Sequence, residues 1–150
     1  LGAPCERALC YAFRWVDAPK RFPGRMLRLF ETGREQEGRL IADLRRAGIE
    51  VEGAGDRPDQ IGVEFADGHG YGYLDGEARG VPEAPATVHV LECKTHNAKS
   101  FRETKAKGVA LAKPEHFAQV QVYMHLRARR RALYLFVNKD DDEVWCERIE

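Results

Sequence analysis

The stretch YGYLDGEARGVPEAPATVHVLECKTHN, residues 71–97, carries acidic and basic side chains on two predicted strands. Asp75 follows a strand rich in glycine, and Glu92 and Lys94 stand two residues apart in the next strand. Side chains two positions apart in a strand lie on the same face of the sheet, so Glu92 and Lys94 point the same way. Charged groups on a strand that is predicted to be buried need partners nearby. We therefore expect Asp75, Glu92 and Lys94 to form a polar site.

The composition indicates a single globular domain. The chain has 150 residues, of which 43% are hydrophobic, and this suits one packed domain covering residues 1–150. Its 24 basic and 24 acidic residues cancel, so a polyanionic partner has to be held by a local basic patch. No apolar run is long enough to predict a membrane span. The chain begins at Leu1 rather than Met, which leaves open that it is a fragment of a longer protein.

The cysteines do not follow a metal-binding pattern. Cys5, Cys10, Cys93 and Cys146 are scattered, and no two of them form a Cys-x-x-Cys pair. A zinc site is therefore not expected. No secretory leader pattern is found, and disulfides are rare in the cytosol, so we expect reduced thiols in a cytoplasmic protein.

Helical and strand patterns alternate along the chain. Helices are predicted over residues 5–16, 32–48 and 114–128, and strands as a hairpin over 61–76, over 87–95 and as a pair within 132–150. Residues 47–59 are predicted to be an exposed turn and residues 77–86 a loop, because both contain glycine and proline. This order predicts an α/β fold in which a central mixed β-sheet is flanked by helices.

The predicted second helix has recognisable signals at both ends. Thr32 and Glu35 have the spacing of a capping box, and Gly48 is typical of a helix C-terminus. The apolar stripe of this helix consists of Leu40, Ile41, Leu44 and Ala47.

Glu37 lies on the apolar side of that helix. It precedes Leu40 by three residues and Leu44 by seven, which places it on the same stripe. A carboxylate on a core-facing stripe is unfavourable unless it is paired or bound to a metal. Two explanations are open. Either Glu37 lies near the start of the helix, where the stripe is still exposed to solvent and the helix dipole favours an acid, or it lies beside Asp75 and Glu92.

Three converging carboxylates and an ammonium group favour a particular chemistry. Glu37, Asp75 and Glu92 would repel one another and ionise together only when a cation neutralises them. Oxygen ligands without histidine or thiolate favour Mg²⁺ or Mn²⁺. Such an ion polarises a phosphoryl oxygen and lowers the pKa of bound water, and Lys94 adds a charge that orients the water or stabilises developing negative charge. The combination predicts hydrolysis of a phosphodiester.

The predicted helix over residues 114–128 presents polar side chains on one face. Glu115, Gln119 and Tyr123 are spaced by four residues and so lie on the same side. Gln119 and Tyr123 offer neutral hydrogen bonds to a phosphate or to Lys94. A separate apolar stripe consists of Phe117, Val120 and Met124. A helix that only packs against the sheet is therefore an equally open explanation.

Four short motifs follow one another along the chain. LDG at residues 74–76 and ECK at 92–94 resemble the signature of the PD-(D/E)XK nuclease superfamily, with leucine in place of the usual proline. GREQE at 33–37 resembles the GxxxE helix motif, and QVQVY at 119–123 resembles the QxxxY helix, of its RecB-like and lambda-exonuclease-like branch. The motifs occur in the expected order over roughly residues 30–125. The chain looks like a small phage-type exonuclease of this branch.

The resemblance implies a restriction-endonuclease-like core, with a central mixed β-sheet flanked by α-helices, and roles for the motif residues. The implied metal ligands are Glu37, Asp75, Glu92 and the backbone carbonyl of Cys93. The implied catalytic residues are Asp75, Glu92, Lys94, Gln119 and Tyr123. Lys94 would serve the attacking water, and Gln119 would position Lys94 or a phosphate. The implied cofactor is Mg²⁺ or Mn²⁺; relatives with an iron–sulfur cluster use three late cysteines, whereas this chain has only Cys146, so we expect no iron–sulfur cluster.

Basic side chains predict where DNA would lie. Arg34 and Gln119 are expected to bind the substrate. The densest basic run consists of Arg127, Arg129, Arg130 and Arg131. This run suits phosphate binding, and a solvated helix end explains it equally well. A further group, expected in a loop that lines a groove, consists of Lys99, Lys105 and Lys107.

The residues and the resemblance together favour a Mg²⁺-dependent DNA nuclease. The expected activity is that of an exonuclease in DNA recombination, repair or phage DNA processing. The alternatives are an endonuclease of the same fold or a non-catalytic DNA-binding module, and a module has no need of Asp75, Glu92 and Lys94. The expected partner is DNA, in the cytoplasm of a bacterium or of a phage-infected host cell and without a membrane. A homo-oligomer or a recombination partner protein is left open.

Overall fold

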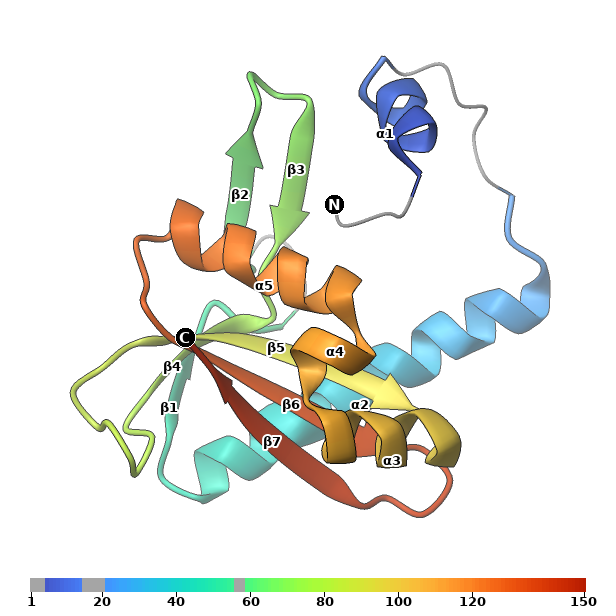
Figure 1. Cartoon of the computed structure of the whole chain (residues 1–150). Coiled ribbons are helices and arrows are strands. Elements are labelled where there is room, and N and C mark those ends of the chain that lie inside the picture. The colour runs from blue at the N-terminus through green and yellow to red at the C-terminus, as the bar shows by residue number, and fades with distance from the viewer. Residues whose placement is uncertain (1–4, 15–20, 56–58) are drawn as a thin grey trace.

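The computed structural model describes residues 5–14, 21–55 and 59–150 (Figure 1). The helices are α1 (Glu6–Phe13), α2 (Gly24–Arg46), α3 (Ala98–Lys107), α4 (Val109–Ala112) and α5 (Pro114–Leu126). The strands are β1 (Glu50–Glu52), β2 (Gly62–Phe65), β3 (Gly70–Tyr73), β4 (Gly76–Arg79), β5 (His89–His96), β6 (Ala132–Asn138) and β7 (Val144–Ile149). Five strands form one sheet in the order β1-β4-β5-β6-β7, and β2 and β3 form a separate hairpin. The pair β5–β6 is parallel and the other pairs are antiparallel, so the predicted mixed sheet is confirmed.

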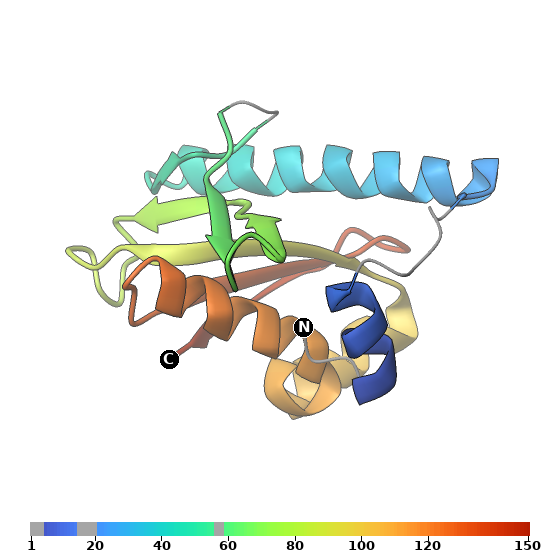
Figure 2. The same cartoon turned by 90° about the horizontal axis from the view of Figure 1, so that it is seen from above.

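Helices cover both faces of the five-stranded sheet. Helix α2 runs along one face, and α3, α4 and α5 lie on the other (Figure 2). Alternation along β5 explains the division, because Leu91 and Cys93 pack on the α2 side while Val90 packs on the α5 side. The partner strand β6 is buried along its whole length, as expected for a central strand with a continuous apolar run.

Helix α2 is longer than its sequence signals predicted. It begins at Gly24 after Pro23, so the predicted capping box at Thr32 and Glu35 is wrong. Thr32 lies inside the helix, and its Oγ1 donates a hydrogen bond to the Arg28 carbonyl at 3.0 Å. Three members of the predicted apolar stripe are buried, namely Leu40, Ile41 and Leu44, whereas Ala47 is the exposed C-cap.

Two short strands replace a predicted turn and a predicted loop. Strand β1 falls within the turn predicted at 47–59, and β4 begins at Gly76, the last residue of the predicted hairpin, and continues into the loop predicted at 77–86. They pair antiparallel, with Val51 opposite Ala78, and both of these side chains are buried. Strands of three and four residues are too short to show a periodicity, so their pairing depends on the neighbouring strand β5.

The segment after β5 is helical and not the predicted loop. Asn97 caps α3 by accepting a hydrogen bond from the Ser100 N–H at 2.9 Å, and Gly108 ends the helix with φ +78°. Phe101 and Thr104 are the buried residues of α3. The lysines predicted to line a groove are therefore held on a helix that packs against the sheet.

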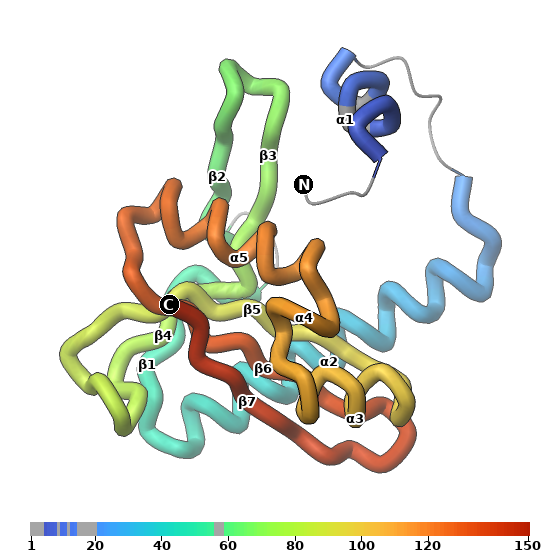
Figure 3. The backbone as a smooth tube through the Cα atoms, viewed as in Figure 1, coloured from blue at the N-terminus to red at the C-terminus, as the bar shows by residue number. Residues whose placement is uncertain are grey.

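The predicted β2–β3 hairpin is confirmed, and it packs against α5 (Figure 3). Two glycines of β3 allow close packing, Gly72 against α5 and Gly70 within the hairpin. A Cβ at Gly72 would lie 2.5 Å from the Tyr123 hydroxyl oxygen, and a Cβ at Gly70 would overlap the Phe65 ring. Glycine is therefore needed where side chains, not backbones, press against the strand.

The N-terminal helix α1 lies beside the hairpin (Figure 1). The helix predicted over residues 5–16 is confirmed for Glu6–Phe13, and Val16 lies outside the described residues. Phe13 stacks on His69 of the hairpin turn with ring centroids 4.2 Å apart. All four cysteines are free thiols. Within the described parts of the chain, no helix combines the length and the apolar character required to cross a bilayer.

Candidate active site

Strand β5 continues past the end of its neighbour β4, and the open edge holds the predicted site. Pairing between β4 and β5 ends at Gly76 and Leu91. The chain turns away at Asp75, whose Oδ2 accepts a hydrogen bond from the Cys93 N–H at 2.7 Å. The N–H and C=O of one strand residue point to the same side, so the Cys93 carbonyl lies at this edge too. Two of the predicted ligand groups are thus brought together.

Glu92 is a fully buried carboxylate with incomplete pairing. Its residue is 0% exposed, and its Oε1 accepts a hydrogen bond from the Lys94 Nζ. Its Oε2 is buried and has no hydrogen-bond partner among the described residues. Burial raises the pKa of Glu92 to about 7; the Lys94 charge opposes this shift, and the charges of Asp75 and Glu37 add to it. The site therefore accommodates this carboxylate poorly as an anion unless further positive charge is supplied.

Lys94 remains a cation in this setting. Its side chain is 26% exposed, so the ammonium group reaches toward solvent while its stem is covered. Burial by itself lowers the pKa of Lys94, but the carboxylates of Glu92 and Asp75 outweigh it and raise the pKa above its ordinary value. Burial also raises the pKa of Asp75, against the opposing effects of Lys94 and the Cys93 hydrogen bond. The two acids and the base form one electrostatic unit.

Glu37 approaches this unit from α2. It is half-buried, one turn before Leu40, which rules out the fully wet helix start. Burial raises the pKa of the Cys93 thiol, and Glu37 contributes to that increase as it does at Glu92. Glu37 therefore adds negative charge near Glu92 and Cys93, and its place among the metal ligands stays a prediction.

The acids offer the oxygen ligands that a hard divalent cation prefers. All the groups concerned are oxygens, and the unpartnered Glu92 Oε2 and the raised pKa of Glu92 both favour an added positive charge. Within the ranges that the structure describes, no three histidine, cysteine or acidic side chains already form a closed ligand cluster. Mg²⁺ or Mn²⁺ fits the residues present, and the assignment of ligands remains a prediction.

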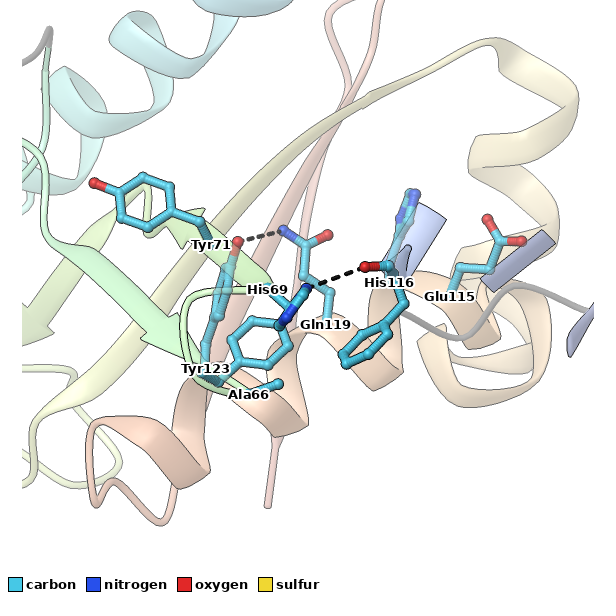
Figure 4. Close-up of a pocket in the computed structure, with 10 residues that line it drawn as sticks. Ala66, His69, Tyr71, Glu115, His116, Gln119 and Tyr123 are labelled. Carbon is cyan, nitrogen blue, oxygen red and sulfur yellow. Dashed lines mark hydrogen bonds between the residues drawn. The ribbon is translucent and has the colours of Figure 1, made fainter. Parts of the chain in front are cut away.

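Gln119 and Tyr123 lie together on α5, as their spacing predicted. The Gln119 Nε2 donates a hydrogen bond to the Tyr123 Oη at 3.3 Å (Figure 4). Burial raises the pKa of Tyr123; the Gln119 hydrogen bond opposes this shift, and the field of Glu92 adds to it. Tyr123 is buried against Gly72 of the hairpin and Gln119 is half-buried, so Gln119 is the more accessible member of the pair.

A hydrogen-bond network on the α5 side of the sheet was not predicted from the sequence. Tyr134 is fully buried and lies opposite Glu92 in the β5–β6 register. Its Oη lies 2.6 Å from the His116 Nδ1 and 3.4 Å from the His96 Nε2. The His96 Nδ1 lies 2.7 Å from the Ser100 Oγ. This hydrogen-bond network thus connects α3, β5, β6 and α5.

Both histidines of this hydrogen-bond network, His96 and His116, are held neutral. Burial lowers the pKa of His96 and of His116 to about 4, and the positive charges of Lys113 and Lys94 contribute to each. One feature of the sequence pointed to this network. His96 continues the two-residue alternation of Glu92 and Lys94 along β5, so its side chain lies on the same face. Tyr134 gave no signal of its own, since an aromatic residue in an apolar strand is ordinary.

A cavity of about 510 Å³ opens beside Gln119 and Tyr123 (Figure 4). Its walls come from α1, the hairpin and α5. The lining residues are Phe13, Phe65, Ala66, His69, Gly70, Tyr71, Glu115, His116, Gln119 and Tyr123. Figure 4 shows the Tyr71 ring turned away from Gln119, so the hairpin side is formed by its other aromatic residues.

The basic residues fall into two groups. Arg127 and Arg129 bind the buried Glu77, and the Arg131 Nε lies 3.2 Å from the Glu150 Oε1. Three of the four arginines predicted to hold phosphates are therefore engaged in ion pairs within the chain, and Arg130 is exposed. Arg34 is exposed on α2, one turn before Glu37. Among the described residues the structure does not join Arg34 by a hydrogen bond to the acids of the site, and its role stays a prediction.

The architecture, a five-stranded mixed sheet with helices on both faces, is similar to that of solved exonuclease structures. The crystal structure of LHK-Exo in complex with dAMP matches with a TM-score of 0.66 and 22% identity, over 98% of this chain and 71% of that chain. The crystal structure of an alkaline exonuclease, LHK-Exo from Laribacter hongkongensis, matches with a TM-score of 0.64 and 21% identity, over 99% and 71%. The crystal structure of SSO0001 matches with a TM-score of 0.51 and 16% identity, over 97% and 62%.

These likenesses establish the fold, and the fold predicted from the four motifs is confirmed. No protein-family model matches the chain, and no curated protein matches it in sequence. The similarity is therefore one of structure, and the chemistry has to be argued from the residues of this chain.

Proposed function

We propose that this protein is a metal-dependent DNA nuclease that hydrolyses phosphodiester bonds as an exonuclease. The observation that carries the proposal is the buried, half-paired Glu92 beside Asp75 and Lys94 at an open strand edge. Strongly shifted pKa values that arise from burial and a neighbouring charge are typical of functional sites. The likeness to an alkaline exonuclease, and to LHK-Exo in complex with dAMP, supports DNA as the substrate.

The ligands proposed for the ion are Asp75, Glu92 and the Cys93 carbonyl, with Glu37 completing the set directly or through water. When bound, Mg²⁺ or Mn²⁺ supplies polarisation of the phosphoryl oxygen and a more acidic water. The chain contributes the placement of these oxygens, because the Cys93 N–H fixes Asp75 and the β5 backbone fixes Glu92. These contacts support the proposal that Asp75 and Glu92 are ligands held on a rigid element.

Lys94 and Gln119 are the groups proposed to act on the substrate. As an ammonium ion, Lys94 donates hydrogen bonds to the attacking water or to the oxygens on which negative charge develops. Gln119 contributes its amide to a phosphate oxygen, and Tyr123 holds that amide through their hydrogen bond. Arg34 is proposed to contact a phosphate further along the strand.

The biological setting goes with the proposed chemistry. We assign the activity to residues 1–150 as one domain, in the cytoplasm of a bacterium or a phage-infected cell. Recombination, repair and phage DNA processing are the processes that such an exonuclease serves. Homo-oligomer formation or a recombination partner protein would be consistent with the exposed apolar side chains Leu27 and Phe30 at the start of α2.

The test uses end-labelled linear DNA and closed circular DNA with Mg²⁺, each with and without a chelator. We expect metal-dependent loss of the linear DNA only. Nicked circles would indicate an endonuclease, and binding without cleavage a DNA-binding module. Lys94→Ala should abolish cleavage and largely keep DNA affinity, whereas Lys139→Ala, at an exposed lysine after β6, should cut normally. Normal cleavage by Lys94→Ala would refute the proposed mechanism.

A further inference from the structure

The cavity beside Gln119 has an aromatic wall and a polar wall. The hairpin and α1 contribute the aromatic wall, which consists of Phe13, Phe65 and His69. Phe13 and His69 are stacked at an interplanar angle of 23°, and the His69 Nδ1 donates a hydrogen bond to the Phe13 carbonyl at 3.0 Å. The two elements are therefore joined at this wall, and Phe13 remains 52% exposed.

The polar wall belongs to α5. Glu115, His116 and Gln119 line the cavity within a little more than one helical turn, so donors and acceptors face the aromatic rings. His116 uses its Nδ1 in the hydrogen bond with the buried Tyr134, which fixes the ring and leaves the Nε2 as the atom available to a ligand. Such a wall offers hydrogen bonds in a defined direction.

We propose that this cavity binds one unpaired nucleobase of the DNA substrate, stacked on the Phe13–His69 wall with its hydrogen-bonding edge toward His116 and Gln119. A planar ring with polar edges matches both walls, whereas a phosphate matches neither the aromatic wall nor Glu115. The volume of about 510 Å³ falls within the range of small-ligand sites. The proposal rests on the nuclease function proposed above.

The position of the cavity connects it with the candidate active site. Gln119 and Tyr123 line the cavity and also belong to the proposed catalytic group. A base seated here would keep its own phosphate close to Gln119, so the cavity would hold the strand by its base while the acids of β5 act on the backbone. Stacking accepts every base, which suits an enzyme that digests strands without regard to sequence.

The experiment measures equilibrium binding of two single strands of equal length in the presence of a chelator, so that no cleavage occurs. One strand carries adenine bases, and the other carries abasic residues with the same number of phosphates. We expect the protein to prefer the base-bearing strand by roughly 5- to 150-fold, as stacking of a base requires. Phe13→Ala and His69→Ala should each lose most of this preference.

Matched controls separate the cavity from other aromatic surfaces. Tyr11→Ala removes an exposed aromatic side chain of α1, the helix that carries Phe13, and Tyr11 does not line the cavity. His125→Ala removes an exposed histidine of α5 that does not line the cavity either. Both controls should keep the preference, and thermal melts should show that all four variants fold. Equal binding of the two strands by the wild type, or an unchanged preference in Phe13→Ala and His69→Ala, overturns the nucleobase site. Cleavage of linear DNA in the separate Mg²⁺ assay would then leave the nuclease proposal standing.

Discussion

Two glutamates of the central sheet are both buried, yet their surroundings differ completely. Glu77 on β4 is 7% exposed and accepts hydrogen bonds from the Arg127 Nε at 2.8 Å and from two nitrogens of Arg129 at 3.1 and 2.7 Å. Glu92 on β5 is 0% exposed and has only one hydrogen-bond partner among the described residues, Lys94. One carboxylate is fully satisfied and the other is not.

The difference appears in the pKa values. Burial would raise the pKa of Glu77, but the hydrogen bonds from Arg129 and Arg127 outweigh it and lower the pKa below its ordinary value. Deeper burial raises the pKa of Glu92 to about 7; Lys94 opposes this shift, and the charges of Asp75 and Glu37 add to it. A satisfied buried carboxylate needs no further partner, whereas added positive charge would favour the ionised form of an unsatisfied one beside other acids.

The largest effect is expected for Glu92→Gln. The amide keeps the shape of the side chain and an acceptor for Lys94 but removes the charge proposed to bind the ion. Cleavage of linear DNA should fall by about 10²- to 10³-fold, the size seen when one electrostatic group is removed from a catalytic site. Glu77→Gln is the matched control, and folded protein of that variant should cut at the wild-type rate. A Glu92→Gln variant with normal activity would make Glu92 a structural residue like Glu77.

The next effect concerns stability. Glu77→Ala leaves Arg127 and Arg129 without their shared anion, and their side chains are 33% and 32% exposed. The free energy of unfolding should fall by ~2–3 kcal/mol, at or below the usual cost of breaking a buried ion pair because both arginines retain some solvent. Urea denaturation measures this loss. A change within the error of the extrapolation would show that the arginines have other partners.

A pH-dependent loss of stability is expected from His96 and His116, which are hydrogen-bonded to Tyr134. Burial lowers the folded-state pKa of His96 and His116 to about 4, from an ordinary value of 6.5. The unfolded chain therefore takes up protons first as pH falls, so the stability contributed by the neutral histidines is complete above pH 6.5 and is lost as pH falls toward 4.

Thermal melts between these pH values would measure that loss, and His116→Gln should flatten the curve. His125→Gln, on an exposed position of the same helix, should leave the slope unchanged. If the two variants behave alike, burial does not hold His116 neutral.

The smallest effect is expected for an exposed cation. Arg34→Ala should weaken DNA binding a few-fold and reduce the slope of log affinity against log salt by about 1, because one phosphate contact is lost. Arg46→Ala, in an exposed pair with Asp43 at the far end of α2, is the control. An unchanged salt slope in Arg34→Ala would remove this residue from the substrate path.

Several parts of the site followed from local spacing. The two-residue interval between Glu92 and Lys94 put them on one face, and the four-residue interval between Gln119 and Tyr123 let them form a hydrogen bond. Short strands and long-range partners did not follow in this way. Strands β1 and β4 are too brief to show alternation, and Tyr134 meets His116 only because β6 and α5 pack together.

The chain's own pattern thus specified the hairpin, β5, α5, the mixed sheet and the order of the acidic residues, because backbone periodicity depends on neighbours in sequence. Which buried glutamate is satisfied and which is left open depended on the folded molecule. Arg127 and Arg129 reach Glu77 across about fifty residues, as the hydrogen bonds show, while the early end of β4 leaves Asp75 and Glu92 at an unpaired edge. Charges acquire a function from the neighbours that folding gives them, and those neighbours are distant in sequence.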